Sequence, residues 1–230
     1  MHFHLPKPLH GWRAFAGEVG IIVVGVLIAL AAQQVVEQVN WDRNVTEARE
    51  DLRAELSDNL FNAVERVRLE PCIERRLDQL SELIDEPPPK PWKLLNGRNI
   101  VPIRVWRASA WDTAVADGVV AHMSRRERAE YAGVYSYVRG LHAIVLDEYP
   151  VSVEFRMLEH GGPLSEASQD RLRADIARMR GYNHLLALGG GQISKEIRDL
   201  GVELDQDSRQ ELAGETCMLP RDALRAPPRA

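Results

Sequence analysis

The sequence predicts an all-α protein in which a single N-terminal transmembrane helix continues into a long amphipathic helix and is followed by an irregular helical bundle. Three observations support this fold class. No charged residue lies between Glu18 and Glu37. From residue 38 onward, apolar residues recur at intervals of three and four, the spacing of one helical face. The second half of the chain carries a helix-capping sequence, Ser124-Arg-Arg-Glu127.

The uncharged run predicts a transmembrane helix over residues 18–37, after an N-terminal tail of residues 1–17. As a helix the run would span about 27 Å, close to the ~30 Å hydrocarbon core of a bilayer. Trp12 and Trp41 would lie about 43 Å apart, which suits the two headgroup layers where tryptophan is enriched. Two alternatives remain open, namely a core helix of a soluble protein and a cleaved signal peptide.

One face of this segment carries small residues. Gly25, Ala29 and Ala32 fall on it at spacings of four and three, and Glu18 lies on the same side. Small residues so placed let membrane helices approach closely. We therefore expect the lipid bilayer as one partner, and a second copy or another membrane protein as a further one. The alternative is that glycine and alanine are simply common in membrane helices.

Charges beside the segment bear on its orientation. Lys7 and Arg13 lie on one side and Arg43 and Arg49 on the other, so the count of basic residues does not decide it. The short N-terminal tail favours a cytoplasmic N-terminus. We predict a single-pass protein of the cell inner membrane with its soluble domain in the periplasm.

The anchor and its flanks have a specific pattern: Gly11-Trp-Arg-Ala-Phe15, then Glu18 to Leu30, then Gln34 and Glu37. This pattern resembles the opening of an uncharacterised family of bacterial single-pass membrane proteins, and a weaker likeness continues around Trp111, Gly118, His122, Met123 and Tyr131. The resemblance implies an uncleaved anchor. It supplies no catalytic residue.

Residues 38–86 are expected to form the long amphipathic helix, with a kink near Pro71 because proline removes a backbone donor. Its apolar face would consist of Val45, Ala48, Leu52, Leu56, Leu60, Ala63, Val67, Ile73, Leu77, Leu80 and Ile84. Three prolines at 87–89 end it. Residues 87–108 then read as a proline-containing loop, because Pro102 weakens the interpretation as a strand.

Residues 109–219 are expected to form the helical bundle. Ser109 looks like the N-cap of a short helix that Gly118 closes. Pro150 either kinks or divides the next helix, and the glycines at 189–191 interrupt the apolar pattern, through close packing or a break in the helix. Residues 220–230, rich in proline and arginine, are predicted to be a disordered tail.

The two cysteines, Cys72 and Cys217, both follow the anchor. In an exported domain an even number of cysteines suggests a disulfide, here one that links the long helix to the C-terminal segment. The alternative is two buried thiols in a cytoplasmic core.

The chemistry that the sequence offers is sparse. With 29 Lys+Arg against 34 Asp+Glu, the net charge of −5 argues against nucleic acid as a partner. The glycines at 189–191 lack the lysine of a phosphate loop, and the histidines lack metal-ligand spacing. We therefore expect no cofactor, no metal and no enzymatic activity, although residues distant in the sequence can converge.

One aromatic set is a candidate pocket, formed by Trp111, Tyr131 and Tyr135 with His122 close by. Aromatic residues at helical spacing also make ordinary core, and that alternative stands. The sequence thus favours a membrane-anchored helical domain that acts in protein interaction or assembly at the cell envelope. The alternative is an extracytoplasmic module that senses or binds a small molecule.

Overall fold

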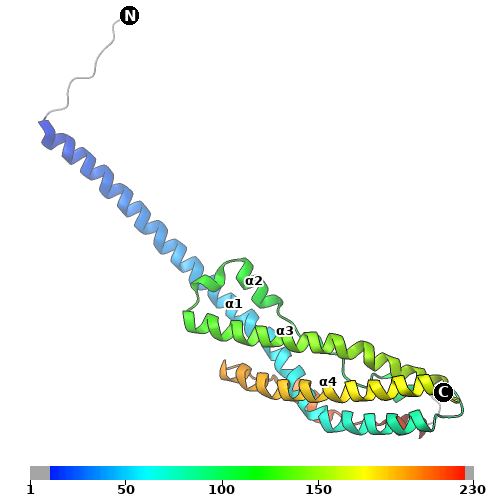
Figure 1. Cartoon of the computed structure of the whole chain (residues 1–230). Coiled ribbons are helices and arrows are strands. Elements are labelled where there is room, and N and C mark those ends of the chain that lie inside the picture. Colours follow the sequence, from blue (N-terminus) through cyan, green and yellow to red (C-terminus); the bar gives the residue numbers. More distant parts are fainter. Residues whose placement is uncertain (1–10, 226–230) are drawn as a thin grey trace, which may run out of the picture. The chain divides into compact units, whose positions relative to one another are not determined.

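The structure is a computed structural model that describes residues 11–225, apart from the side chains of Arg13 and Ala14. Within that range the regular elements are all helical, which confirms the all-α fold class. They are α1 (Gly11–Asp85), η1 (Leu94–Gly97), α2 (Ser109–Ala116), η2 (Val119–His122), α3 (Arg125–Glu154), η3 (Phe155–His160), α4 (Glu166–Asp199), α5 (Gln206–Gly214) and α6 (Pro220–Arg225) (Figure 1). The chain divides into two compact units between Glu47 and Ala48.

The first unit contains the N-terminal part of α1. The helix begins at Gly11, whereas the sequence predicted a tail up to residue 17. Residues 11–17 contain no proline, so nothing in the backbone prevents the helix from extending to Gly11. From Phe15 onward α1 is long and apolar enough to cross a membrane, and none of its most apolar stretch is buried. Residues 1–10 of the predicted tail lie outside the described residues.

The second unit is built on three long helices, residues 48–85 of α1 together with α3 and α4. Most of the predicted apolar face of α1 is the core face, with Leu52, Leu56, Leu60, Ala63, Ile73, Leu77, Leu80 and Ile84 fully buried. Val67, predicted on the same face, is instead 40% exposed. Helix α4 supplies Leu172, Met179, Leu186, Ile193 and Ile197, and α3 supplies Tyr135 and Val138. Regular spacing of three and four thus buries one stripe of each helix.

A buried ion pair links all three helices. Arg66 on α1 donates to Glu148 on α3 through both terminal nitrogens, one of them at 3.2 Å, and only 5% and 1% of these side chains are exposed. Burial raises the pKa of Glu148 above its ordinary value, while the Arg66 charge opposes that shift. Asn183 on α4 accepts from Arg66 at 3.4 Å and donates to the Glu70 carbonyl at 3.2 Å. Because each partner is buried, this network fixes the register of the three helices.

Two prolines lie inside helices without ending them. α1 passes through Pro71 and α3 through Pro150, so Pro150 does not divide its helix. Each proline is exposed, so the carbonyl four residues earlier, which loses its helical hydrogen bond, lies on the solvent-facing side of the helix. Figure 1 shows α1 changing direction along its cyan-to-teal part, as the predicted kink near Pro71 requires.

The glycines at 189–191 lie within an unbroken α4, so of the two expected explanations close packing is the right one. A methyl group on Gly190 would lie 2.9 Å from the Ala63 carbonyl oxygen of α1. On Gly189 it would lie 2.6 Å from a methyl carbon of Leu141 on α3. These two glycines therefore let the three helices approach, whereas Gly191 faces open space.

The chain end is more ordered than the sequence predicted. Residues 220–225 form α6, and residues 226–230 lie outside the described residues. Pro220 suits the first turn of a helix, and the Asp222 carboxylate accepts from the Leu219 amide at 3.0 Å. Arg221 is held by α1, since its amide donates to Gln79 at 3.0 Å and its guanidinium pairs with Glu82 at 2.6 Å. Composition predicted disorder, but these tertiary contacts overcome it.

Helix α3 begins at the predicted capping sequence. The Ser124 hydroxyl accepts from the Glu127 amide at 3.2 Å, and the Glu127 carboxylate receives two donors from Arg49 of α1, at 2.6 and 2.9 Å. Hydrogen bonding to Arg49 holds the pKa of Glu127 below its ordinary value.

Replacing Gly190 with alanine should lower the free energy of unfolding by about 1–3 kcal/mol, because the new methyl group meets backbone that cannot move aside easily. Replacing the neighbouring Gly191 is the matched control and should raise that free energy by up to ~1 kcal/mol, since alanine favours a helix. Denaturant titration followed by circular dichroism measures both. Equal effects at the two positions would contradict the packing described for α4.

Glu127→Gln should lower the free energy of unfolding by about 1 kcal/mol near pH 7, because a charge-assisted bond to Arg49 is lost. A lowered pKa stabilises the fold above the ordinary pKa, and that stabilisation disappears as the pH falls through the folded-state pKa. The difference from the unmutated protein should therefore shrink as the pH falls through the folded-state pKa of Glu127. Glu130→Gln, on the exposed side of the same helix, should change little over the same pH range.

Candidate functional site

Polar side chains of α1 hold the proline-containing loop in place. The Glu55 carboxylate accepts from the backbone amides of Ser109 and Ala110 at 3.0 and 3.1 Å. Asn59 donates to the Arg107 carbonyl at 2.8 Å and accepts from the Arg107 amide at 3.0 Å. Asn62 donates to the Val105 carbonyl at 3.1 Å. Side chains of α1 thus pair with backbone amides and carbonyls of the loop, as a neighbouring strand would in a sheet.

The loop and α1 run in opposite directions and match in length. Contacts extend along α1 from Glu55 to Arg76, about 31 Å at helical rise, and along the loop from Ser109 back to Ile100, about 30 Å in extended form. The last contact is a 2.6 Å bond from Arg76 Nη1 to the Ile100 carbonyl. The sequence predicted Ser109 itself as the cap of α2, but Ser109 is the first helical residue and the amides are capped by Glu55.

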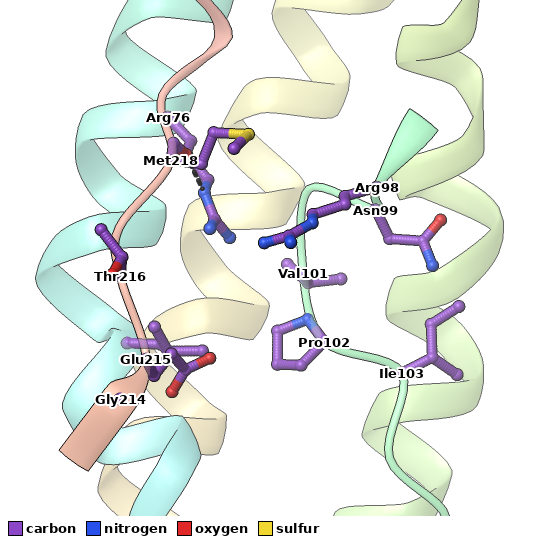
Figure 2. A pocket seen from close by; sticks show the side chains of 11 residues that line it. Arg76, Arg98, Asn99, Val101, Pro102, Ile103, Gly214, Glu215, Thr216 and Met218 are labelled. Carbon is purple, nitrogen blue, oxygen red and sulfur yellow. Dashed lines mark hydrogen bonds between the residues drawn. The ribbon is translucent and has the colours of Figure 1, made fainter. Parts of the chain in front are cut away.

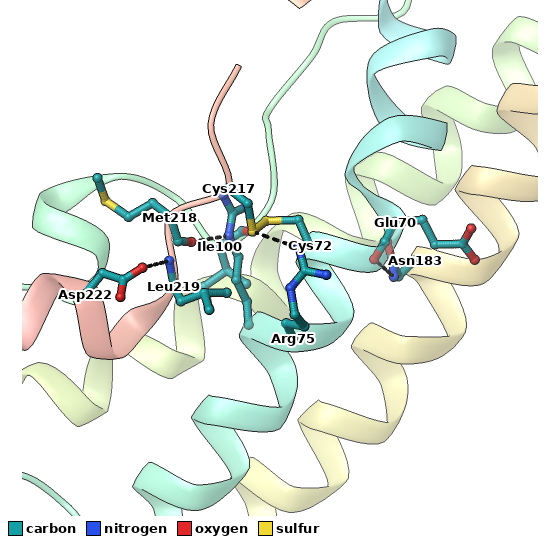
Figure 3. Close-up of a disulfide and its surroundings, with 10 residues drawn as sticks. Glu70, Cys72, Arg75, Ile100, Asn183, Cys217, Met218, Leu219 and Asp222 are labelled. Atoms are coloured by element: carbon teal, nitrogen blue, oxygen red, sulfur yellow. Dashed lines mark hydrogen bonds between the residues drawn. A yellow bond between two sulfur atoms is a disulfide. The ribbon is translucent and has the colours of Figure 1, made fainter. Parts of the chain in front are cut away.

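The C-terminal segment lies on α1 in the same direction as the helix. Arg68 donates to the Leu212 carbonyl at 2.5 Å, and Arg76 Nε donates to the Met218 carbonyl at 2.8 Å. Between these contacts Cys72 and Cys217 form the predicted disulfide, with 5.7 Å between their α-carbons. Figure 3 shows the bridge with Arg75, whose guanidinium reaches the Cys217 sulfur at 3.6 Å.

The two segments that α1 holds enclose a groove of about 500 Å³, which we call the Arg76 groove. Figure 2 shows one wall from the loop and the other from the C-terminal segment, which lies in front of α1. Its lining residues are Leu69, Arg76, Arg98, Asn99, Val101, Pro102, Ile103, Gly214, Glu215, Thr216 and Met218. Sequence reasoning missed this groove. The available signal was Arg76, a charged residue at a helical position between Cys72 and Leu80 that periodicity assigns to the core.

A second hollow, the α3–α4 groove, has a volume of about 450 Å³ and a mostly apolar lining. It is bordered by Gly133, Ser136, Tyr137, Gly140, Leu141, Ile144, Leu185, Leu188 and Gly189. Leu185 and Leu188 are about half exposed, at 50% and 54%. Added side-chain carbons at Gly133 and Gly140 would meet no atom within 4 Å, so these glycines are open depressions.

The aromatic set comes together as packed core. Trp111 stacks on Tyr135 and Tyr131 with ring centroids 5.8 and 6.4 Å away, and all three residues are at least 92% buried. The Tyr135 hydroxyl donates to the Leu52 carbonyl at 3.3 Å, and burial raises the pKa of this phenol. His122 is exposed in η2, whereas the stacked rings are buried. The grooves described above are lined by other residues.

The predicted association face lies wholly in the first unit. Glu18, Gly25, Ala29 and Ala32 are exposed positions of α1, and a side-chain carbon on Gly25 would meet nothing within 4 Å. Within the first unit, no residue that the structure describes covers this face. No group of three or more metal-ligating side chains gathers anywhere in the described range.

Comparison with known proteins does not assign the chain to a family. No family model, no curated protein and no solved structure matches the chain. The resemblance seen around the anchor stays a prediction.

Removing the disulfide with Cys72→Ser and Cys217→Ser should lower the free energy of unfolding. The bridge spans a sequence separation of 145 residues, and loop-closure entropy sets an upper value of about 5 kcal/mol for such a loop. Denaturant titration with and without reductant measures the loss. The double variant, which has no thiol, should not respond to reductant, and an unmutated protein equally insensitive to reductant would show that the bridge does not form.

Proposed function

We propose that the chain is a membrane-anchored helical domain whose copies associate through the α3–α4 groove. The apolar part of α1 would hold it in the inner membrane of a bacterial cell, in keeping with the resemblance of its anchor. Helix length and the exposed apolar surface from Phe15 onward support this anchoring. The disulfide supports a periplasmic location for the second unit, because such bridges persist in oxidising compartments.

The observation that carries the proposal is the apolar surface beside the groove. Leu185 and Leu188 lie about half exposed on α4, next to a hollow whose lining is mainly apolar. By contrast, the leucines and isoleucines at the centre of the three-helix core, such as Leu56, Leu77 and Ile193, are fully buried. Contiguous exposed apolar surface on a soluble unit typically marks an interaction site.

The same patch contains both parts of a self-complementary contact. Leu185 and Leu188 project as knobs, and the uncovered glycines Gly133 and Gly140 provide depressions across the groove on α3. A two-fold dimer places the same patch on both subunits, so each copy's leucines meet the other's glycines. Anchoring in a membrane also raises the effective concentration of copies and gives them a common orientation, which favours a second copy over a soluble partner.

Leu185→Glu combined with Leu188→Glu should weaken association at least about tenfold, because two apolar contacts are lost and two charges would be buried. Energy transfer between two differently labelled full-length chains in lipid vesicles measures association. Val115→Glu with Leu224→Glu is the matched control, since both residues are exposed apolar positions away from the groove.

Loss of energy transfer in the groove variant alone would support the proposal. An unmutated chain that stays monomeric in vesicles would refute it, as would equal effects in both double variants. Gly25→Leu tests the anchor face separately, and an unchanged signal there would confine association to the second unit.

A further inference from the structure

Arg76 is a buried cation that forms no ion pair with any residue that the structure describes. Only 9% of the residue is exposed, and its two described hydrogen bonds go to neutral carbonyls, those of Met218 and Ile100. Among the described residues none accepts from its remaining terminal nitrogen, Nη2. A buried guanidinium ordinarily pairs with an anion, because an uncompensated charge in a low-dielectric site is costly. Burial accordingly lowers the pKa of this guanidinium.

A second guanidinium faces the first. Figure 2 shows the Arg98 side chain crossing the groove towards Arg76, so that the two charged ends approach from opposite walls. Arg98 follows η1 in the loop, and Arg76 comes from α1. Like charges in proximity repel, and this repulsion contributes to the lowered pKa of Arg76. An anion between the two would remove the repulsion and supply the missing pair.

Glu215, the acidic residue that lines the groove, does not form the missing ion pair with Arg76. Glu215 is on the C-terminal wall, and no ion pair joins it to Arg76 or Arg98 in the described structure. Burial is the main cause that raises the pKa of its carboxyl, and repulsion from Glu65 adds to it. The negative charge of Glu215 raises the pKa of Arg76 and partly offsets the effect of burial, but without a direct contact, and it would repel an incoming anion.

The apolar residues that line the rest of the groove indicate which kind of molecule would fit beside the two guanidinium groups. Val101, Pro102 and Ile103 lie on one wall and Met218 lies on the other, while Leu69 of α1 also lines the groove. Small-molecule sites of about this volume commonly combine an apolar lining with a few fixed charged groups. The arrangement fits a molecule with one charged end and an apolar remainder better than it fits a bare inorganic anion.

We propose that the Arg76 groove binds a small organic carboxylate, with its carboxylate between Arg76 and Arg98 and its apolar part against Val101, Pro102 and Met218. The planar fork of a guanidinium matches a carboxylate in geometry and charge. The site lies within one chain, so it does not depend on the association of copies.

The test uses the full-length protein in zwitterionic lipid nanodiscs with its methionine methyl groups labelled for NMR. 4-Methylpentanoate is the probe, and 4-methylpentanamide, which has the same shape and no charge, is its control. The Met218 resonance should shift in a saturable way with the carboxylate, with affinity on the order of millimolar, and at least about tenfold more weakly with the amide. Met123, which is buried and belongs neither to the groove lining nor to the core cluster that Met218 packs against, should not move.

Three variants sharpen the test. Arg98→Gln should weaken binding about tenfold, and because Arg98 is exposed the fold should survive. Glu215→Gln should strengthen binding several-fold by removing a repulsive charge. Arg171→Gln, an exposed arginine of α4, is the matched control and should change nothing.

Saturable shifts at Met218 with these effects would support the proposal. It would be overturned if the carboxylate moved Met218 no more than Met123, if the amide or inorganic phosphate bound equally well, or if Arg98→Gln and Glu215→Gln both left affinity unchanged.

Discussion

The second unit depends on one constraint, which is that backbone groups outside regular structure still need partners. The loop from Ile100 to Ala108 belongs to no helix and no strand, yet it lies against the core. Helix α1 satisfies it with side chains, above all with Asn59, which bonds both polar backbone groups of Arg107. The polar residues of α1 therefore contribute to the fold as its leucines do, because their hydrogen bonds position the two segments that form the Arg76 groove.

Local signals explain what the sequence predicted well. Spacing of three and four identified the buried stripe of α1, from Leu52 to Ile84, because burial of one helical face imposes that period. The capping sequence at Ser124 marked the start of α3, since the hydroxyl and the Glu127 amide are only three residues apart. The pairing of Cys72 with Cys217 followed from a count of two, not from any knowledge of their distance.

Tertiary contacts explain what the sequence did not predict. From the sequence alone Gly190 could break a helix, but in the structure it lets α1 pack against α4. The composition of residues 220–225 predicts disorder, but contacts with Gln79 and Glu82 hold these residues as α6. The Arg76 groove unites segments that are far apart in the chain, so no window of residues contains it. Its one local sign was a charged residue in an apolar stripe. The reverse happened with Trp111, whose aromatic neighbours suggested a pocket and form packed core instead.

The position of the Arg76 groove along the chain has a consequence for biosynthesis. One wall is translated with the loop, but the other, residues 214–218, is translated much later. Cys72 and Cys217 are separated by 145 residues, which take roughly 7–30 s to translate at ordinary elongation rates. A nascent polypeptide therefore carries only one wall of the groove until residues 214–218 have been made and Cys217 can pair with Cys72.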